Sequence, residues 1–345
     1  MDMLPVELIL HVAEQLDIKS IVKFMCTNKR THSILCDQQQ YFFLRRLPQF
    51  MVAPSSDVFS SEIYLRRPLQ YASFEMAYEM ETRTARIEAI IASEFADVTS
   101  GADIGALSLE QHKYLAYILK RAMSHCDYIA DIAAHTPCKP IAKIWYEKIQ
   151  TDWKAFDVPL GYRLMDPYTN LEARPVQAAY IQTLPAEDLV MIYFLLEVLK
   201  TSFINANFER YEDDTSFPER IDVFGECVLR HGSWFAYSYI LGGAPWDAMA
   251  NDIMVLGDVE RIGFELGEVD TPTSLGVSVR ERFEELFPCE KRSEDAKNGV
   301  SHTLDPLYAL EPQGERLRAA ITYIVTGKAE GADIEDEAIE EATEE

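Results

Sequence analysis

The chain has 345 residues, of which 48% are hydrophobic and 26% are charged, and its formal net charge is −25. This hydrophobic content is ordinary for a packed protein, and the length allows one large domain or two. So acidic a chain repels phosphate backbones, which argues against a nucleic-acid partner.

The sequence also predicts an intracellular protein, in the cytoplasm, the nucleus or both. No apolar run approaches the roughly 18 residues that a membrane span needs, and no basic stretch precedes an apolar one at the N-terminus. We therefore expect neither a membrane partner nor a secretory signal. The six cysteines include no close pair, which favours reduced thiols over a disulfide framework.

The first predicted element is a helix at the N-terminus. Pro5 suits the start of a helix, where a missing N–H costs nothing, and Glu7 favours the positive end of the helix dipole. Its apolar stripe repeats every four residues, with Ile9 beside it. The stripe consists of Leu4, Leu8, Val12 and Leu16.

Two more short helices are expected after Asp17 interrupts this pattern. One carries Ile21 and Phe24, and the other begins near Asn28-Lys29-Arg30. Three short helices in under about 40 residues bury little area of their own. We therefore expect the segment either to pack against the rest of the chain or to present its stripe to another protein.

The ungapped run from Leu4 to Leu35 resembles an F-box. The resemblance rests on the Leu4-Pro5-x-Glu7-Leu8 start, the apolar residues of the second helix, and the basic pair Lys29-Arg30. It implies three helices that bind a Skp-type adaptor, which links them to a cullin ubiquitin ligase. The adaptor-binding residues that it implies are Leu4, Pro5, Leu8, Ile9, Val12, Leu16, Ile21 and Phe24.

The opening tetrapeptide alone has no specificity. Leu184-Pro185-Ala186-Glu187 repeats it, and that copy opens a helix that is apolar nearly all round and is predicted to lie in the core. The F-box resemblance therefore depends on the whole run and its position at the N-terminus.

The remainder of the chain is predicted to be helical, because strand-like alternation is nearly absent. The segment 41–44 continues an apolar helical edge that is expected to pack the N-terminal module onto the rest. A long loop is expected at 157–175. The expected helices cover 62–95 with a break at Pro68, 108–132, 141–156, 184–208, 218–230, 233–241, 245–256, 277–287 and 311–326.

The predicted fold class is mainly α in three parts. An F-box-like module of three helices occupies residues 1–47, an irregular helical domain occupies 48–327, and a disordered acidic tail occupies 328–345. The tail carries nine acidic residues and one lysine. Like-charged segments of this kind are usually solvated.

No catalytic or cofactor-binding motif was found, so we expect no enzyme activity and no cofactor. The best metal candidate combines His125 and Cys126 with His135 and Cys138. On a continuous helix the two histidines lie about 15 Å apart, too far for one zinc ion, so we expect no metal site. The aromatic clusters Trp145, Tyr146 and Trp153, and Trp234, Phe235, Tyr237 and Tyr239, are expected to be core.

The function that this pattern favours is that of a non-catalytic substrate receptor, which binds a Skp-type adaptor, through it a cullin, and an unknown protein substrate for degradation. Three alternatives stay open: an adaptor-binding protein outside ubiquitin transfer, a helical scaffold with the N-terminal stripe packed inside, and an enzyme without a recognisable motif. Burial of Leu4, Leu8 and Val12 against residues 62–130 would favour the scaffold.

Overall fold

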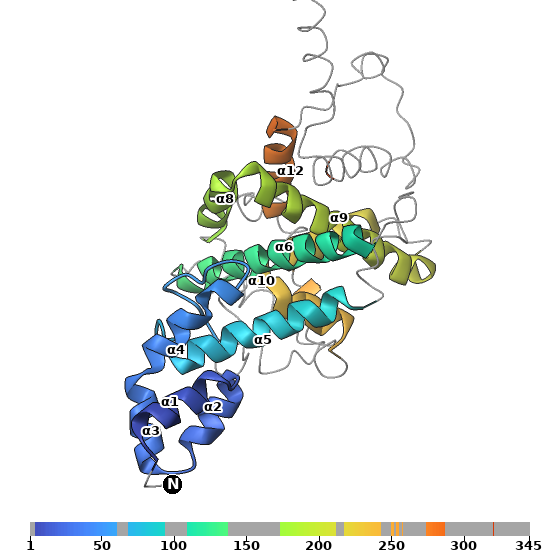
Figure 1. The fold of residues 1–345 in the computed structure, drawn as a ribbon. Coiled ribbons are helices and arrows are strands. Elements are labelled where there is room, and N and C mark those ends of the chain that lie inside the picture. The colour runs from blue at the N-terminus through green and yellow to red at the C-terminus, as the bar shows by residue number, and fades with distance from the viewer. Residues whose placement is uncertain are drawn as a thin grey trace, which may run out of the picture.

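The computed structural model describes residues 4–60, 68–93, 109–136, 173–211, 217–242 and 274–286, together with Ala250, Asn251, Ile253, Met254, Gly257 and Ala320. In these ranges every regular element is a helix (Figure 1), and the extended backbone forms one isolated bridge, between Phe59 and Pro68. The predicted mainly α fold is confirmed. The helices expected at 141–156 and 311–326, and the acidic tail, lie outside the described residues.

The N-terminal module and the larger helical part follow each other along the molecule, with α1 to α3 at one end (Figure 1). The first part contains α1 (Val6–Glu14), α2 (Ile18–Met25), α3 (Lys29–Asp37), α4 (Gln39–Arg46) and the 3-10 helix η1 (Leu47–Gln49). The second contains α5 (Phe74–Ile91), α6 (Leu109–His135), α8 (Ala173–Thr183), α9 (Ala186–Tyr211), α10 (Phe217–Ile240) and α12 (Leu275–Leu286).

Side-chain caps start four of these helices where the sequence places a short polar residue, Ser274 of α12 among them. The backbone N–H of Ser20 donates to the Asp17 carboxylate (2.6 Å) at the start of α2, and that of Thr31 donates to Asn28 (2.8 Å) at the start of α3. Ser73 caps α5 in the same way. Each cap satisfies one of the backbone donors that a helix start leaves without a partner.

Two hydrophobic cores form, and α5 takes part in both. The first core joins the N-terminal module to the beginning of α5, through Phe74, Met76 and Ala77. The second begins at Ile87 and Ile90 near the other end of α5 and continues into α6, α9 and α10. Because one continuous helix is buried in both cores, it fixes the module relative to the helical part.

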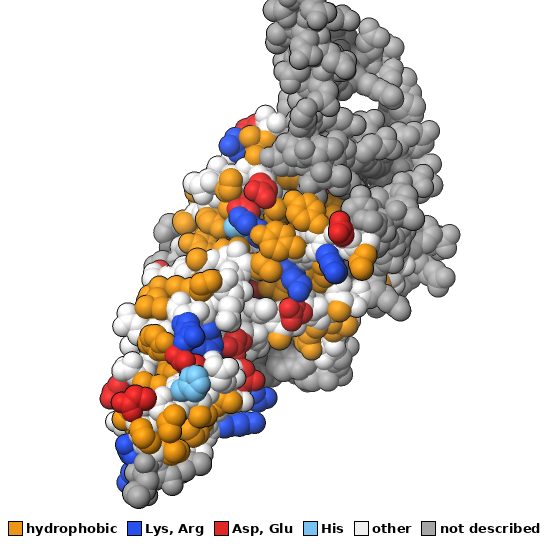
Figure 2. Space-filling model, viewed as in Figure 1, with side chains coloured by type: hydrophobic (Ala, Val, Ile, Leu, Met, Phe, Trp, Pro, Cys, Tyr) orange, Lys and Arg blue, Asp and Glu red, His pale blue; other side chains and the backbone are white. Residues whose placement is uncertain are grey.

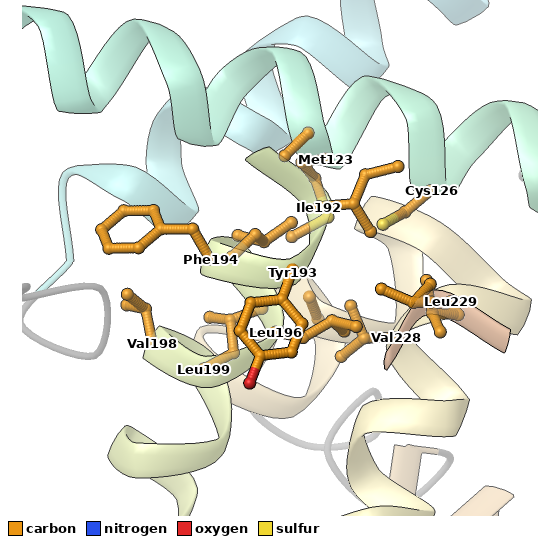
Figure 3. Packing of buried hydrophobic residues seen from close by; sticks show 14 of the residues in the cluster. Met123, Cys126, Ile192, Tyr193, Phe194, Leu196, Val198, Leu199, Val228 and Leu229 are labelled. Carbon is orange, nitrogen blue, oxygen red and sulfur yellow. The ribbon is translucent and has the colours of Figure 1, made fainter. Parts of the chain in front are cut away.

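The second core is built around α9, which is buried on nearly all sides (Figure 3). Met123 and Cys126 of α6 approach Ile192 from one side, and Val228 and Leu229 come from α10. The sequence predicted that the helix opened by Leu184-Pro185-Ala186-Glu187 lies in the core, and the burial of α9 confirms this. Contrary to the expectation from the sequence, Ala186–Asn207 is long and apolar enough for a membrane span, but 72% of its most apolar window is buried inside the protein.

A buried ion-pair network holds α5 against α6 and the preceding segment. The Arg83 guanidinium donates two hydrogen bonds to Asp131 of α6 (2.7 and 2.8 Å) and one to Glu79 (2.9 Å). It also donates to the carbonyl oxygen of Phe59 (2.9 Å). Burial acts to lower the pKa of Arg83, but Asp131 and Glu79 together raise it well above its ordinary value, so the group stays charged.

α10 contains a kink at Gly232, where the sequence had predicted two separate helices. Gly232 has φ +62°, a left-handed conformation that favours glycine, and it lies directly against Asp127 of α6. The backbone N–H and hydroxyl of Ser233 donate to the Asp127 carboxylate at 2.7 and 2.8 Å. The kink in α10 therefore depends on its contact with Asp127 of α6, which lies more than one hundred positions earlier in the chain.

The prediction of a loop over 157–175 is wrong at its C-terminal end, because α8 begins at Ala173. The helix α8 itself was not predicted. Pro175 suggested a loop, yet the first turn of a helix tolerates proline. The aromatic residues Trp234 and Phe235 are buried in the second core, as predicted, and Tyr237 and Tyr239 pack against it.

Removing one partner of the buried network should be costly. Asp131→Ala leaves the buried Arg83 charge without its main partner, so we expect the free energy of unfolding to fall by about 3–5 kcal/mol. The surface pair of Lys120 with Glu88 provides the control, since Glu88→Ala should cost less than about 1 kcal/mol. Urea denaturation measures both, and equal losses would contradict the role of the network.

The kink in α10 gives a second stability test. In Gly232→Ala the added methyl group would lie 2.2 Å from an Asp127 carboxylate oxygen and 2.9 Å from the Asp127 Cα, on an unfavourable φ. We expect a loss of about 1–3 kcal/mol or more. Gly276→Ala in α12 meets nothing closer than 3.6 Å and should be neutral or stabilising by up to about 1 kcal/mol. Thermal melting that ranks the two variants the other way would refute this explanation of the kink.

Candidate functional site

An apolar face of α1 points into solvent. Leu8 and Val12 lie on one side of the helix and Leu4 just before it, at a spacing of four residues, and their exposed fractions are 49%, 46% and 38%. Pro5 is also exposed. Figure 2 shows hydrophobic side chains gathered at this end of the molecule. A soluble protein rarely leaves a row of large apolar side chains exposed without a binding role.

The opposite side of the module is packed into the first core. Ile9 has an exposed fraction of 2%, and Ala13, Ile18 and Ile21 are fully buried. They share this core with Phe42 and Phe43 of α4, and the Phe42 ring lies 6.0 Å from the ring of Phe74 of α5. The predicted packing of segment 41–44 onto the rest of the chain is thus confirmed. Since the inner side is filled, the outer side is free for a partner.

Polar contacts hold the ends of α1 and α2 in place. Arg46 donates to the carbonyl oxygen of Leu16 (2.6 Å) and pairs with Glu81 of α5 (3.3 Å). The backbone N–H of Ile18 also donates to Glu81 (3.2 Å). Burial raises the pKa of Glu81, an effect that these two donors oppose. One α5 carboxylate therefore links the start of α2 to the end of α4.

A second contact fixes the end of α1 against α4. The Tyr41 hydroxyl donates to the Glu14 carboxylate (2.6 Å), and Arg45 donates to the same oxygen. The hydrogen bond from Tyr41, with Arg45 beside it, lowers the pKa of Glu14. Both ends of the short linker between α1 and α2 are thereby held by α4 and α5.

The family model of the F-box domain matches residues 1–43. The N-terminal module is an F-box domain. The match covers α1, α2, α3 and the first half of α4, so the resemblance recognised from the sequence is confirmed. No curated protein and no solved structure matches the chain significantly.

The structure divides the eight residues expected to bind the adaptor into two groups. The F-box places Leu4, Pro5, Leu8 and Val12 on its exposed side. Ile9 and Ile21 lie inside the first core, and Leu16 and Phe24 are half-buried against it. The first group is accessible to a partner, and the second holds the three helices together.

Two exposed apolar residues of α1 and α2 were not among those eight. Val6 has an exposed fraction of 39%, and Val22 of α2 has one of 41%. Neither falls on the four-residue repeat that defined the stripe. The signal for Val22 was available in Lys19, because residues three apart on a helix share a face and a lysine faces solvent.

The described part of the chain contains no group of three or more His, Cys, Asp or Glu side chains suited to a metal ion. His125 lies between the Tyr180 hydroxyl (2.9 Å) and Asp188 (3.4 Å), and burial raises the pKa of the neighbouring Cys126. Although burial acts to raise it, the nearby His125 ring and the hydrogen bonds from Arg121 lower the pKa of Asp188 to about 2. The side chain of His135 and all of Cys138 lie outside the described residues.

A shallow cleft between segment 50–54, α5 and α6 is a second candidate site. It is lined by apolar residues such as Phe50 and by Arg83, Asp127 and Asp131. Those three charged groups are already bonded, Arg83 to Asp131 and Asp127 to Ser233. The cleft therefore gives no indication of a ligand, and the exposed face of the F-box is the stronger candidate.

Two neighbouring residues of α1 distinguish binding from packing. Leu8→Ala removes an exposed side chain and should change the free energy of unfolding by no more than about 0.5 kcal/mol. Ile9→Ala empties a core position and should cost about 2–5 kcal/mol. Denaturation curves of the two variants check the assignment, which fails if Leu8→Ala is the more destabilising.

Proposed function

We propose that this protein is a substrate receptor of a cullin ubiquitin ligase, and that its F-box binds a Skp-type adaptor. The proposal is carried by one observation: the F-box keeps Leu4, Leu8 and Val12 exposed while its inner side is buried. An F-box is a protein-interaction module, so a partner surface is the natural destination for this face.

The exposed face has the composition of a binding surface. Interface energy is usually concentrated in a few well-packed side chains near the centre of the contact. On α1 we expect Leu8 and Val12 to form the centre of the contact, because they are the most exposed large apolar residues of this helix. Because each is already about half-buried, covering the remainder would contribute about 0.7–1.5 kcal/mol, half of the value for a fully exposed side chain. The alternative in which these residues pack against 62–130 is contradicted by their exposure.

The helical part would supply the second function of a receptor, which is to hold a protein substrate. Since α5 is buried in both cores, the substrate-binding part and the adaptor-binding face move as one body. This rigid connection through α5 would hold a substrate near the transferring enzyme, which is an effect of proximity rather than of catalysis. The receptor is thus expected to be non-catalytic, to need no cofactor and to work inside the cell.

A pull-down tests the adaptor assignment. Leu8→Asp places a charge at the centre of the apolar contact, so binding to a purified Skp-type adaptor should fall at least roughly a hundredfold, about 2.7 kcal/mol. Val176→Asp, on an exposed valine of α8, is the matched control and should bind as the wild type does. The proposal fails if the wild type binds no adaptor, or if both variants bind equally well.

Recovery of the cullin separates the ligase receptor from an adaptor-binding protein outside ubiquitin transfer. A tagged wild-type chain should recover adaptor and cullin together, and Leu8→Asp should lose both. Adaptor without cullin would instead favour the alternative function.

A further inference from the structure

Two exposed tyrosines lie side by side on α6, away from the F-box (Figure 1). Tyr114 and Tyr117 are 44% and 39% exposed, and their rings are stacked, with an interplanar angle of 11° and centroids 6.5 Å apart. The opposite side of α6, with Ile118 and Met123, is buried in the second core. Aromatic side chains held together in solvent are typical of a protein-binding surface.

A fixed ion pair holds one of these tyrosines. The Arg121 guanidinium donates to the Tyr117 hydroxyl oxygen (3.4 Å) and binds the Asp188 carboxylate of α9 at 2.6 and 3.1 Å. The Asp188 side chain is buried, so it anchors Arg121 to the core. Because an arginine only donates hydrogen bonds, the Tyr117 oxygen accepts this one, and its own hydrogen remains free to donate to a partner.

The charged side chains of α6 around the tyrosines are balanced. Lys120 pairs with Glu88 of α5 (3.0 Å), and Arg121 is already bound. Lys113 is exposed one turn from Glu110, which is exposed as well. An acidic segment would be repelled by the net charge of −25, and a basic segment would meet Lys113 and Arg121. This side of α6 therefore favours an uncharged partner.

We propose that this surface of Tyr114, Tyr117 and Arg121, the tyrosine face, binds an uncharged, proline-rich segment of the protein substrate in an extended conformation. The proposal rests on the proposed function and adds the chemistry of the substrate. The two rings supply the apolar contact, and the Tyr117 hydroxyl supplies a hydrogen bond to the backbone of the segment.

A proline-rich segment offers the groups that the tyrosine face can use. Its polyproline II backbone makes no internal hydrogen bonds, so its carbonyl oxygens are open to the Tyr117 hydroxyl. Proline has no N–H that the face would leave buried without an acceptor. Proline rings pack on exposed aromatic side chains, and the segment is stiff before it binds, so little conformational entropy is lost.

Other kinds of partner segment fit less well. An amphipathic helix is held in a hydrophobic groove, and neither tyrosine lines the cleft between α5 and α6. An added strand needs an open sheet edge, whereas every regular element among the described residues is a helix. A methylated ammonium group, which aromatic rings also attract, would be repelled by Lys113 and Arg121.

The position of the tyrosine face lets a substrate and an adaptor bind at the same time. The F-box lies at one end of the molecule and α6 lies further along it (Figure 1). Figure 2 shows hydrophobic side chains over α6 on the same side of the molecule as the hydrophobic patch of the F-box. Because α5 is buried in both cores, the two surfaces keep a fixed separation.

Fluorescence polarisation with labelled peptides tests the proposal. The probes are peptides of about ten residues with repeated Pro-Pro-Leu or Pro-Pro-Ala, which favour polyproline II. Tyr114→Ala/Tyr117→Ala in the full chain should raise their Kd roughly tenfold or more. The matched control Tyr78→Ala removes a similarly exposed tyrosine of α5 and should leave Kd within about twofold. Thermal melting checks that the variants are folded.

The hydroxyl of Tyr117 allows a finer test. Tyr117→Phe keeps the ring and removes only the donor, so Kd for the proline peptides should rise roughly fivefold, less than in the double variant. Peptides of glycine and serine, of glutamate and of lysine, of the same length, should bind more weakly than the proline peptides to the wild type.

The outcomes separate this proposal from the receptor function. If the wild type recovers the adaptor but does not bind the proline peptides, or binds them as well after Tyr114→Ala/Tyr117→Ala, the proposal is refuted and the receptor function stands. Preferred binding of the glutamate or lysine peptide also refutes it. If the proline peptides bind through the tyrosines but no adaptor is recovered, the tyrosine face stands as a peptide site and the receptor function fails.

Discussion

The contact between the F-box and α5 determines what the rest of the structure can do. Ile9, Ile18 and Ile21 are buried in a core that α4 and the first turns of α5 help to form. Three short helices alone would not bury enough apolar area to be stable. The family match ends at residue 43, yet the folded unit continues through Phe74 and Met76.

The same contact leaves one side of the F-box uncovered and fixes its direction. Glu81 of α5 receives Arg46 and the backbone N–H of Ile18, so α2 and α4 are held at one point of the long helix. Further along α5, Arg83 binds Asp131 of α6. The two groups are only two residues apart in sequence. A shift of the F-box relative to the helical part would break one or both of them.

The sequence was sufficient for most of the elements, α8 excepted, but not for their contacts. Helical spacing predicted α1 to α3 and the core helix α9, because a stripe of apolar residues is a local property. It did not distinguish Leu8, which is exposed, from Ile9, which is buried, because that depends on Phe42 and Met76, distant in sequence. The kink at Gly232 depends on Asp127 in the same way, and the boundary drawn at residue 47 stays a prediction.

Covalent footprinting of the surface side chains, with and without a Skp-type adaptor, tests the central claim most directly. If the outer face of the F-box is the binding surface, adaptor should protect peptides that contain Leu4, Leu8, Val12 and Val22. Peptides from the exposed side of α6, with Tyr114 and Tyr117, should be labelled equally in both samples. Protection of α6 without protection of α1 would contradict the account.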